Sequence, residues 1–176
     1  MVFCKEIPIG KILRGERVFN LKLILSYDTD REYGVGMYLK YNGSQYNIRD
    51  RLDCFFRDVI TPSGEITRET LNNIYLLTQI FLHTRSNMWS MSQNLEIVKH
   101  EVENGFMFSD EYDIRTYLCS IGMDYDHHDH KKFVFPDEGI EFLFNLPGVG
   151  DTYESITEFF GHIEDADYMN AIGTAG

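Results

Sequence analysis

The residues whose types and spacing best suit chemistry lie in one stretch, MDYDHHDHKK (123–132), in which three Asp and three His occupy seven positions. Carboxylates and imidazoles are ligands for zinc and manganese. Side chains so close in sequence cannot all face one ion. A site here would therefore need a further ligand from elsewhere in the chain, such as His162 or Asp165. The candidate ligands within the stretch are Asp124, Asp126, His127, His128 and His130.

Two interpretations of this stretch stay open. In one, bound zinc or manganese makes the chain a metal-dependent hydrolase. In the other, the stretch is a solvated, pH-responsive loop, because it follows a predicted helix ending at Gly122 and precedes a predicted strand near Phe133. Metal ligands are usually held by rigid elements, and the stretch matches no spaced signature such as H-E-x-x-H. We therefore expect no cofactor, with zinc or manganese as the alternative.

The net charge of −12 is concentrated in the C-terminal part of the chain. Residues 1–100 contain 13 Lys and Arg against 11 Asp and Glu, a net charge of +2, whereas residues 101–176 contain 3 against 17, a net charge of −14. Such asymmetry indicates a surface for a basic partner, although net charge also keeps small domains in solution. The carboxylates expected to contact the partner are Asp137, Glu138, Glu141, Asp151, Glu154, Glu158, Glu164, Asp165 and Asp167.

The segment NLPGVGDTYESI (145–156) resembles the hairpin of the helix-hairpin-helix DNA-binding motif. In that family the backbone amides of the Gly-x-Gly turn contact a phosphate, and basic side chains follow early in the second helix. This chain instead places Tyr153, Glu154 and Glu158 there, and acidic side chains repel phosphate. We therefore expect an ordinary turn into a helix and no direct nucleic-acid binding.

Alternating apolar residues predict an antiparallel meander in the N-terminal third. Residues 17–28 and 32–48 each place apolar side chains at every second position, which is the period of a half-buried strand. Asn42-Gly43 indicates a two-residue hairpin turn, because both turn positions need positive φ. The inward-facing residues are Phe19, Leu21, Leu23, Leu25 and Tyr27 in the first strand and Tyr33, Val35, Met37, Leu39 and Tyr41 in the second.

The rest of the chain is predicted to be mainly helical. Apolar residues at helical spacing predict a last helix over 151–165, with Asp151 and Glu154 as a capping box, and a loose tail at about 168–176. Other helices are predicted at 49–60, 68–86, 92–105 and 109–122, with a loop at 61–67 and a short hairpin at 131–145. The expected fold is one α+β domain spanning 1–176: an N-terminal antiparallel β-meander, several helices, a short β-hairpin and a C-terminal helix.

Composition narrows the class of protein. A chain of 176 residues with 43% hydrophobic residues fits one globular domain. No run of about 18 apolar residues is present, so we expect no membrane segment, and the start MVFCKEIPIG lacks the pattern of a secretory signal. Three widely spaced cysteines (Cys4, Cys54 and Cys119) suit a reducing compartment, which favours a cytoplasmic location.

These observations favour a non-catalytic interaction protein over an enzyme. The acidic C-terminal half would bind a basic surface of another protein. If that surface normally binds nucleic acid, the chain would act as a competitive inhibitor that mimics the negative charge of the nucleic acid. Immunity proteins and viral inhibitors of host defence share this composition. Trp89, which lies near Met88 and Met91 between two predicted helices, is either a core residue or part of a contact patch.

Overall fold

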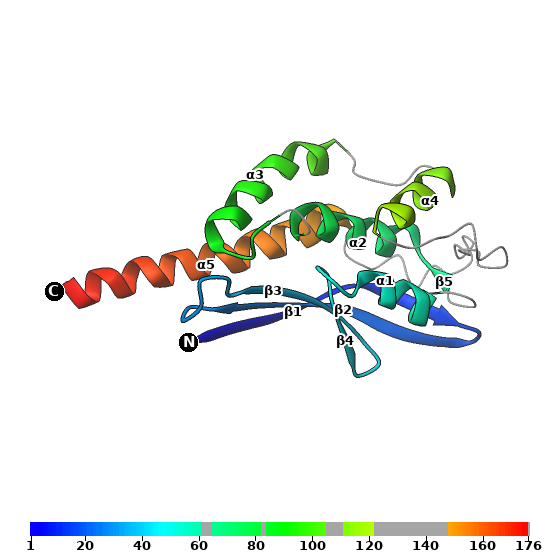
Figure 1. Cartoon of the computed structure of the whole chain (residues 1–176), viewed down its shortest axis with the longest axis horizontal. Helices are drawn as coiled ribbons and strands as arrows, with labels where there is room; N and C mark the ends of the chain where they lie inside the picture. Colours follow the sequence, from blue (N-terminus) through cyan, green and yellow to red (C-terminus); the bar gives the residue numbers. More distant parts are fainter. Residues whose placement is uncertain (61–64, 82–83, 105–110, 122–147, 176) are drawn as a thin grey trace.

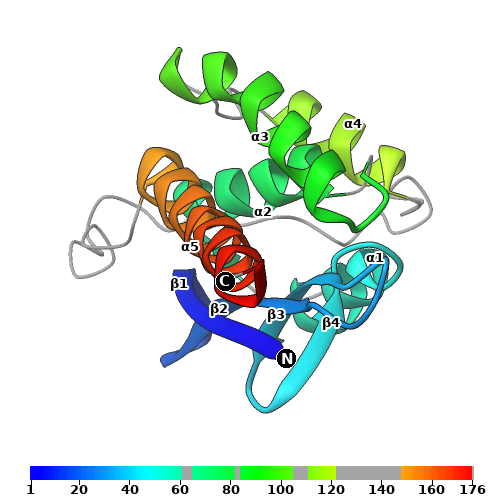
Figure 2. The same cartoon turned by 90° about the vertical axis from the view of Figure 1, so that its left-hand side faces the viewer.

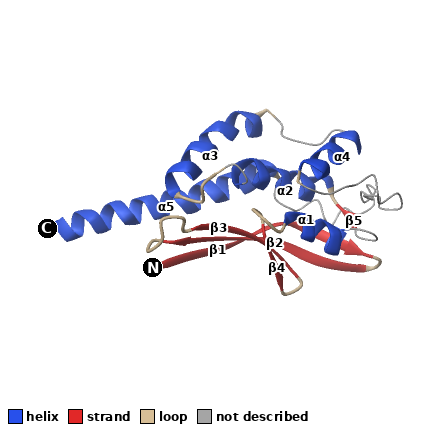
Figure 3. Cartoon of the chain, in the orientation of Figure 1, coloured by secondary structure: helices blue, strands red, loops and turns tan. Residues whose placement is uncertain are grey.

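An antiparallel sheet, four of whose five strands come from the first third of the chain, lies beneath the helices (Figure 1). The computed structural model describes residues 1–60, 65–81, 84–104, 111–121 and 148–175. The five strands lie in the order β4-β3-β2-β1-β5, which confirms the predicted meander (Figure 3). They are β1 (Val2–Arg14), β2 (Arg17–Asp28), β3 (Val35–Tyr41), β4 (Ser44–Asn47) and β5 (Glu65–Ile66). The short strand β5 lies within the predicted loop 61–67, so that prediction is wrong at 65–66.

The longest strand, β1, is not predicted by the alternation rule, because Pro8 and Gly10 interrupt its pattern. It pairs with β2 along its whole length, and the register shifts between Pro8 and Gly10, as in a β-bulge. Gly10 has a φ of +153°, and a Cβ atom there would lie 2.0 Å from Oγ1 of Thr70. The missing side chain therefore lets the helix that contains Thr70 approach the strand.

Four predicted helices are present with shifted ends. The segment predicted at 49–60 forms α1 (Leu52–Phe55) and continues as the π-helical turn η1 (Phe56–Ile60). The helix α3 starts earlier than predicted, because the side chain of Asn87 caps it by accepting a hydrogen bond from the Ser90 amide at 2.8 Å. The other two are α2 (Arg68–Phe81) and α4 (Glu111–Ser120), and α3 spans Met88–Glu103.

The last helix, α5 (Val149–Ala175), is longer than predicted at both ends. It begins before Asp151, which therefore lies in the first turn, so the predicted capping box of Asp151 and Glu154 is wrong. The amide of Thr152 already bonds to the carbonyl oxygen of Gly148 at 3.1 Å. Figure 1 shows α5 extending beyond the sheet. The looseness expected of 168–176 stays a prediction, and the hairpin predicted at 131–145 lies outside the described residues.

One face of the sheet is buried beneath α2 and α5, which lie above the strands in Figure 2. The inward-facing pattern predicted for β2 and β3 is confirmed, except that Tyr33 precedes β3 and is exposed. A polar contact also joins these layers, since the Asn73 amide donates to the Ile9 carbonyl oxygen at 3.0 Å. Core residues of β2 and β3 are Leu21, Leu23, Leu25, Val35, Met37 and Leu39, and those of the helices include Ile74, Leu77, Ile156 and Phe160.

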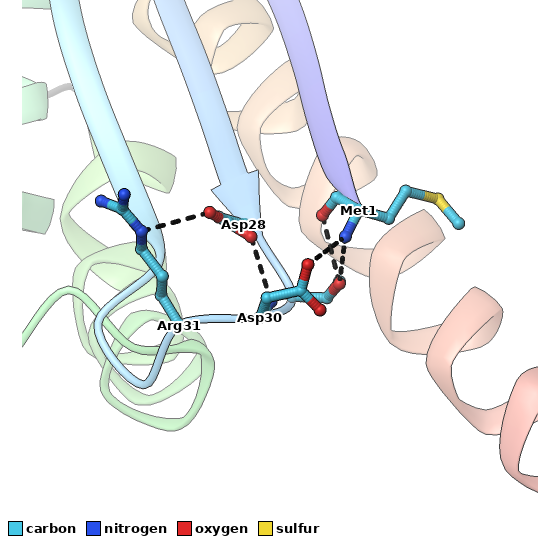
Figure 4. A network of polar contacts seen from close by, with 5 residues as sticks. Met1, Asp28, Asp30 and Arg31 are labelled. Atoms are coloured by element: carbon cyan, nitrogen blue, oxygen red, sulfur yellow. Dashed lines mark hydrogen bonds and ion pairs between the residues drawn. The ribbon is translucent and has the colours of Figure 1, made fainter.

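Polar contacts hold the start of β1 against the loop that joins β2 to β3 (Figure 4). The amino group of Met1 lies 2.9 Å from Oδ2 of Asp30 and 3.0 Å from Oγ1 of Thr29. The Asp28 carboxylate accepts from the Asp30 amide at 3.0 Å and pairs with Nε of Arg31 at 3.3 Å. These groups are largely exposed, so they orient the loop more than they stabilise the fold.

Replacing Gly10 with alanine should destabilise the protein by about 2–4 kcal/mol, because the new Cβ would meet Thr70 in a backbone conformation that L-residues avoid. Urea unfolding followed by circular dichroism measures the change. Gly148→Ala is the matched control, because open space surrounds a Cβ at that position. Equal stability of the two variants would contradict the close approach of α2 to β1.

A buried hydroxyl pair joins α4 to α2. The Thr78 hydroxyl donates to the Ile74 carbonyl oxygen at 2.9 Å, so the Tyr117 hydroxyl, 2.5 Å away, must be the donor to Thr78. The Tyr117 ring also packs edge-on against Tyr75, with ring centroids 5.0 Å apart. Burial raises the pKa of the Tyr117 hydroxyl well above its usual range. This group therefore stays protonated in the folded state at pH values where an unfolded tyrosine ionises.

The free energy of unfolding should consequently fall as the pH rises above about 10, because the unfolded state then binds fewer protons than the folded one. Below that pH the contribution of Tyr117 is fully present. Tyr117→Phe should make this alkaline fall shallower and should cost about 1 kcal/mol at pH 7. Urea unfolding between about pH 7 and about pH 11 measures both effects. The exposed Tyr33→Phe serves as the control, and an identical slope in both variants would contradict this assignment.

Candidate interaction surface

The candidate metal ligands Asp124, Asp126, His127, His128 and His130 lie outside the described residues, as do three of the predicted partner-binding carboxylates, Asp137, Glu138 and Glu141. Both sets stay predictions. In the part of the chain that the structure describes, no group of three or more His, Cys, Asp or Glu side chains could hold a metal ion. The candidate site is therefore built from the described part of the acidic half, which is mainly α5.

Three of the predicted partner-binding residues lie on one exposed side of α5. Asp151, Glu154 and Glu158 are exposed and follow the spacing of one helix face. The opposite face of the helix packs into the core through residues that include Ile156 and Phe160. No Lys or Arg occurs between 149 and 175. The Nε2 atom of His162 lies 3.7 Å from Oε1 of Glu158, and this contact is an ion pair only when the imidazole is protonated. Glu164, Asp165 and Asp167 continue the same helix, and their side chains are not described.

The helix α3 adds carboxylates that sequence reasoning missed. The Tyr153 hydroxyl of α5 donates to the Leu95 carbonyl oxygen of α3 at 2.7 Å. Burial raises the pKa of Tyr153, and the charges of Glu96 and Glu103 raise it further, so both carboxylates lie near this contact. We name the resulting set the acidic face: Glu96, Glu103, Asp151, Glu154 and Glu158. Lys99 is the single Lys or Arg in α3, so negative charge predominates.

An apolar patch lies beside the acidic face on the outer side of α3. Trp89 is 72% exposed and Ile97 is 69% exposed, and the two residues lie two turns apart on the same helix. Together with Gln93 and Glu96 they line an open groove of about 470 Å³. Two large apolar side chains in one exposed groove are typical of a protein contact site. Trp89 and Met91, which are close in sequence, therefore lie in different environments. Met91 is buried in the core, whereas Trp89 is exposed to solvent.

The glycine turn that resembles a helix-hairpin-helix motif leads directly into this acidic helix. Gly148 and Gly150 are exposed, and Asp151 follows them in the first turn of α5. A carboxylate at that position occupies the positive end of the helix dipole, where a phosphate would otherwise bind. The expectation that this turn does not bind nucleic acid stays a prediction.

Other expectations concern cysteines and membranes. Cys4, Cys54 and Cys119 are free thiols, and Cys4 and Cys119 are exposed. None of the described helices is both long enough and apolar enough to cross a membrane. No protein-family model, curated protein or solved structure matches the chain.

The single Trp makes the juxtaposition of patch and acidic face measurable. Relative to its effect on free N-acetyltryptophanamide, caesium should quench Trp89 fluorescence more strongly than iodide does, because nearby carboxylates attract cations and repel anions. The difference should shrink as added salt screens the charges. Stern–Volmer titrations measure both effects, with acrylamide as the neutral quencher.

Glu96→Gln/Glu103→Gln should reduce the difference between caesium and iodide quenching. The variant Glu16→Gln/Glu32→Gln removes the same charge at exposed positions on other elements and should leave the difference largely intact. Equal effects of the two variants would mean that only the net charge of the protein acts on Trp89, and the acidic face would not adjoin the patch.

Proposed function

We propose that the chain is a non-catalytic interaction protein whose acidic face binds a basic surface of a partner protein and inhibits it. The observation that supports this proposal is the contact between Tyr153 of α5 and Leu95 of α3. It lies near Glu96 and Glu103 and joins the acidic side of α5 to the helix that carries the exposed Trp89. The carboxylates of α3 and those of α5 lie in segments more than 40 residues apart in the sequence, on two helices that this contact joins.

The two parts of this surface would contribute differently to binding. Exposed carboxylates attract a basic partner over several ångströms and speed association, but they add modest affinity once in contact. A large aromatic side chain that becomes desolvated at the centre of an interface can instead supply much of the affinity. Trp89 and Ile97 would serve as that anchor, with Glu96 at its border. The partner would thus present an apolar pocket bordered by Lys or Arg.

Inhibition follows if the basic surface of the partner normally holds nucleic acid. A row of carboxylates along α5 would occupy the place of phosphates, and the extension of this helix beyond the sheet makes it accessible to a groove (Figure 1). Immunity proteins and viral inhibitors of host defence act on basic partners in this manner, and we place the chain in that functional class by analogy. The mechanism requires no catalytic group and no cofactor.

Capture from a cell lysate on the immobilised full-length chain tests the proposal. Glu96→Gln/Glu154→Gln/Glu158→Gln should lose a basic protein that the unmodified chain retains, as should Trp89→Ala/Ile97→Ser. For the purified partner, the first variant should slow association roughly tenfold or more at low salt, because the steering charges are removed. The partner should also bind its nucleic acid more weakly when the unmodified chain is present.

The control variant Glu16→Gln/Glu32→Gln/Glu69→Gln also raises the net charge from −12 to −9, by replacing three exposed carboxylates outside the acidic face. It should retain the partner. If the acidic-face variant captures the same proteins as the unmodified chain, or if the partner binds nucleic acid equally well in its presence, the proposal is wrong.

A further inference from the structure

A second surface of opposite character lies at the end of the sheet where β1 turns into β2 and β3 turns into β4. An open cavity of about 380 Å³ is bounded there by these strands and by η1. Its walls include two arginines, three aromatic rings and one carboxylate: Arg14, Arg17, Phe19, Tyr41, Tyr46 and Asp58. None of these residues belongs to the acidic face, so the cavity is independent of the proposed function.

The two arginines provide positive charge in a protein whose net charge is −12. Nη2 of Arg14 donates to the carbonyl oxygens of Asp58 at 3.1 Å and Val59 at 2.5 Å, which fixes the guanidinium against η1. Its Nε is buried without a hydrogen-bond partner. Arg17 lies opposite Arg14 across the turn and is exposed. Among the described residues, no carboxylate lies within ion-pair distance of either guanidinium.

The aromatic rings form a wall next to these charges. Phe19 and Tyr41 are packed together, with ring centroids 5.3 Å apart and planes inclined at 55°. The Tyr46 ring is held edge-on against the buried Phe55, with centroids 5.5 Å apart. Burial raises the pKa of the Tyr46 hydroxyl, and the Asp58 carboxylate raises it further, so these two polar groups lie close together. Positive charge, flat rings and hydrogen-bonding groups are thus combined in one cavity.

We propose that this cavity binds a mononucleotide, a small ligand in which a phosphate is attached through a sugar to a flat heterocyclic ring. Guanidinium groups suit phosphate oxygens in charge and in hydrogen-bond geometry. Aromatic side chains stack on bases of any sequence. The Asp58 carboxylate can accept hydrogen bonds from sugar hydroxyls or from an exocyclic amine. The volume also falls within the range of small-molecule sites, about 300–1,000 Å³.

Each part of the ligand is needed to explain the cavity. An inorganic anion would use Arg17 and leave the rings without a function. An uncharged aromatic ligand would leave the guanidinium of Arg17 without a counter-charge. A nucleic-acid strand would also have to avoid repulsion from a chain with a net charge of −12, whereas a mononucleotide carries little charge beyond the phosphate that the arginines neutralise.

Isothermal titration calorimetry of the full chain with AMP, GMP, CMP and UMP tests the proposal. At least one nucleotide should bind saturably with one site per chain, and more tightly than inorganic phosphate or the matching nucleoside. Arg17→Glu should weaken binding about tenfold or more, because it replaces a charge-assisted hydrogen bond with repulsion. Phe19→Leu should lower the affinity for the nucleotide, while any binding of inorganic phosphate stays unchanged.

Arg85→Glu is the matched control, since Arg85 is exposed and lies in the connection between α2 and α3. It changes the net charge by the same amount and should preserve binding. No saturable binding of any nucleotide, equal binding of inorganic phosphate, or equal binding by Arg17→Glu and the unmodified chain would each overturn the proposal. Thermal melts of each variant verify that a loss of binding is not a loss of folding.

Discussion

The close approach of α2 to β1 is the constraint on which the rest of the structure depends. Gly10 has no side chain, so Thr70 can lie against the strand and accept a hydrogen bond from the Lys11 amide at 3.3 Å. The other end of α2 is held by Arg49, whose guanidinium lies 5.0 Å from the centre of the Phe81 ring. Between these two ends nearly the whole helix is buried, so its position determines where the other helices can pack.

The helices around α2 are placed by polar contacts as well as by the apolar core. The Asn94 amide of α3 donates to the carbonyl oxygens of Gln79 and Ile80 at the end of α2, at 3.1 and 2.7 Å. Tyr117 of α4 reaches Thr78 in the same helix. A buried polar group must find a partner to avoid a large desolvation cost, so each of these contacts selects one arrangement from the many that an apolar surface would tolerate. The exposed side of α3, with Trp89, is a consequence of this placement.

Local patterns in the sequence predicted much of the fold, and non-local contacts explain the rest. The alternation of apolar and polar residues correctly predicted β2 and β3. The Asn42-Gly43 turn was also predicted correctly, because both residues adopt positive φ. The strand β1 escaped prediction because its bulge breaks the period of two at the residue where α2 approaches. The strand β5 has only two residues, which are too few to show an alternating pattern. It forms by antiparallel pairing with Ile12 and Leu13 at the free edge of β1. The pattern of residues along the sequence could not predict the approach of α2 to β1 or the pairing of β5 with β1, because both join segments that are far apart in the chain.

The same distinction between local and non-local contacts applies to the two candidate sites. Asp151, Glu154 and Glu158 were identified because they are close in sequence, whereas Glu96 and Glu103 join them only through the packing of α3 on α5. Arg14 and Arg17 flank an ordinary turn, and only the cavity shows their relation to Phe19 and Tyr41.

A basic cavity can persist in such an acidic protein because salt limits electrostatic interactions to about 8 Å under physiological conditions. The local charges therefore outweigh the net charge of −12 wherever a ligand is close enough to touch them. Since the acidic face is built from α3 and α5 and the cavity from β1–β4 and η1, each can bind a ligand of opposite charge without sharing a residue with the other.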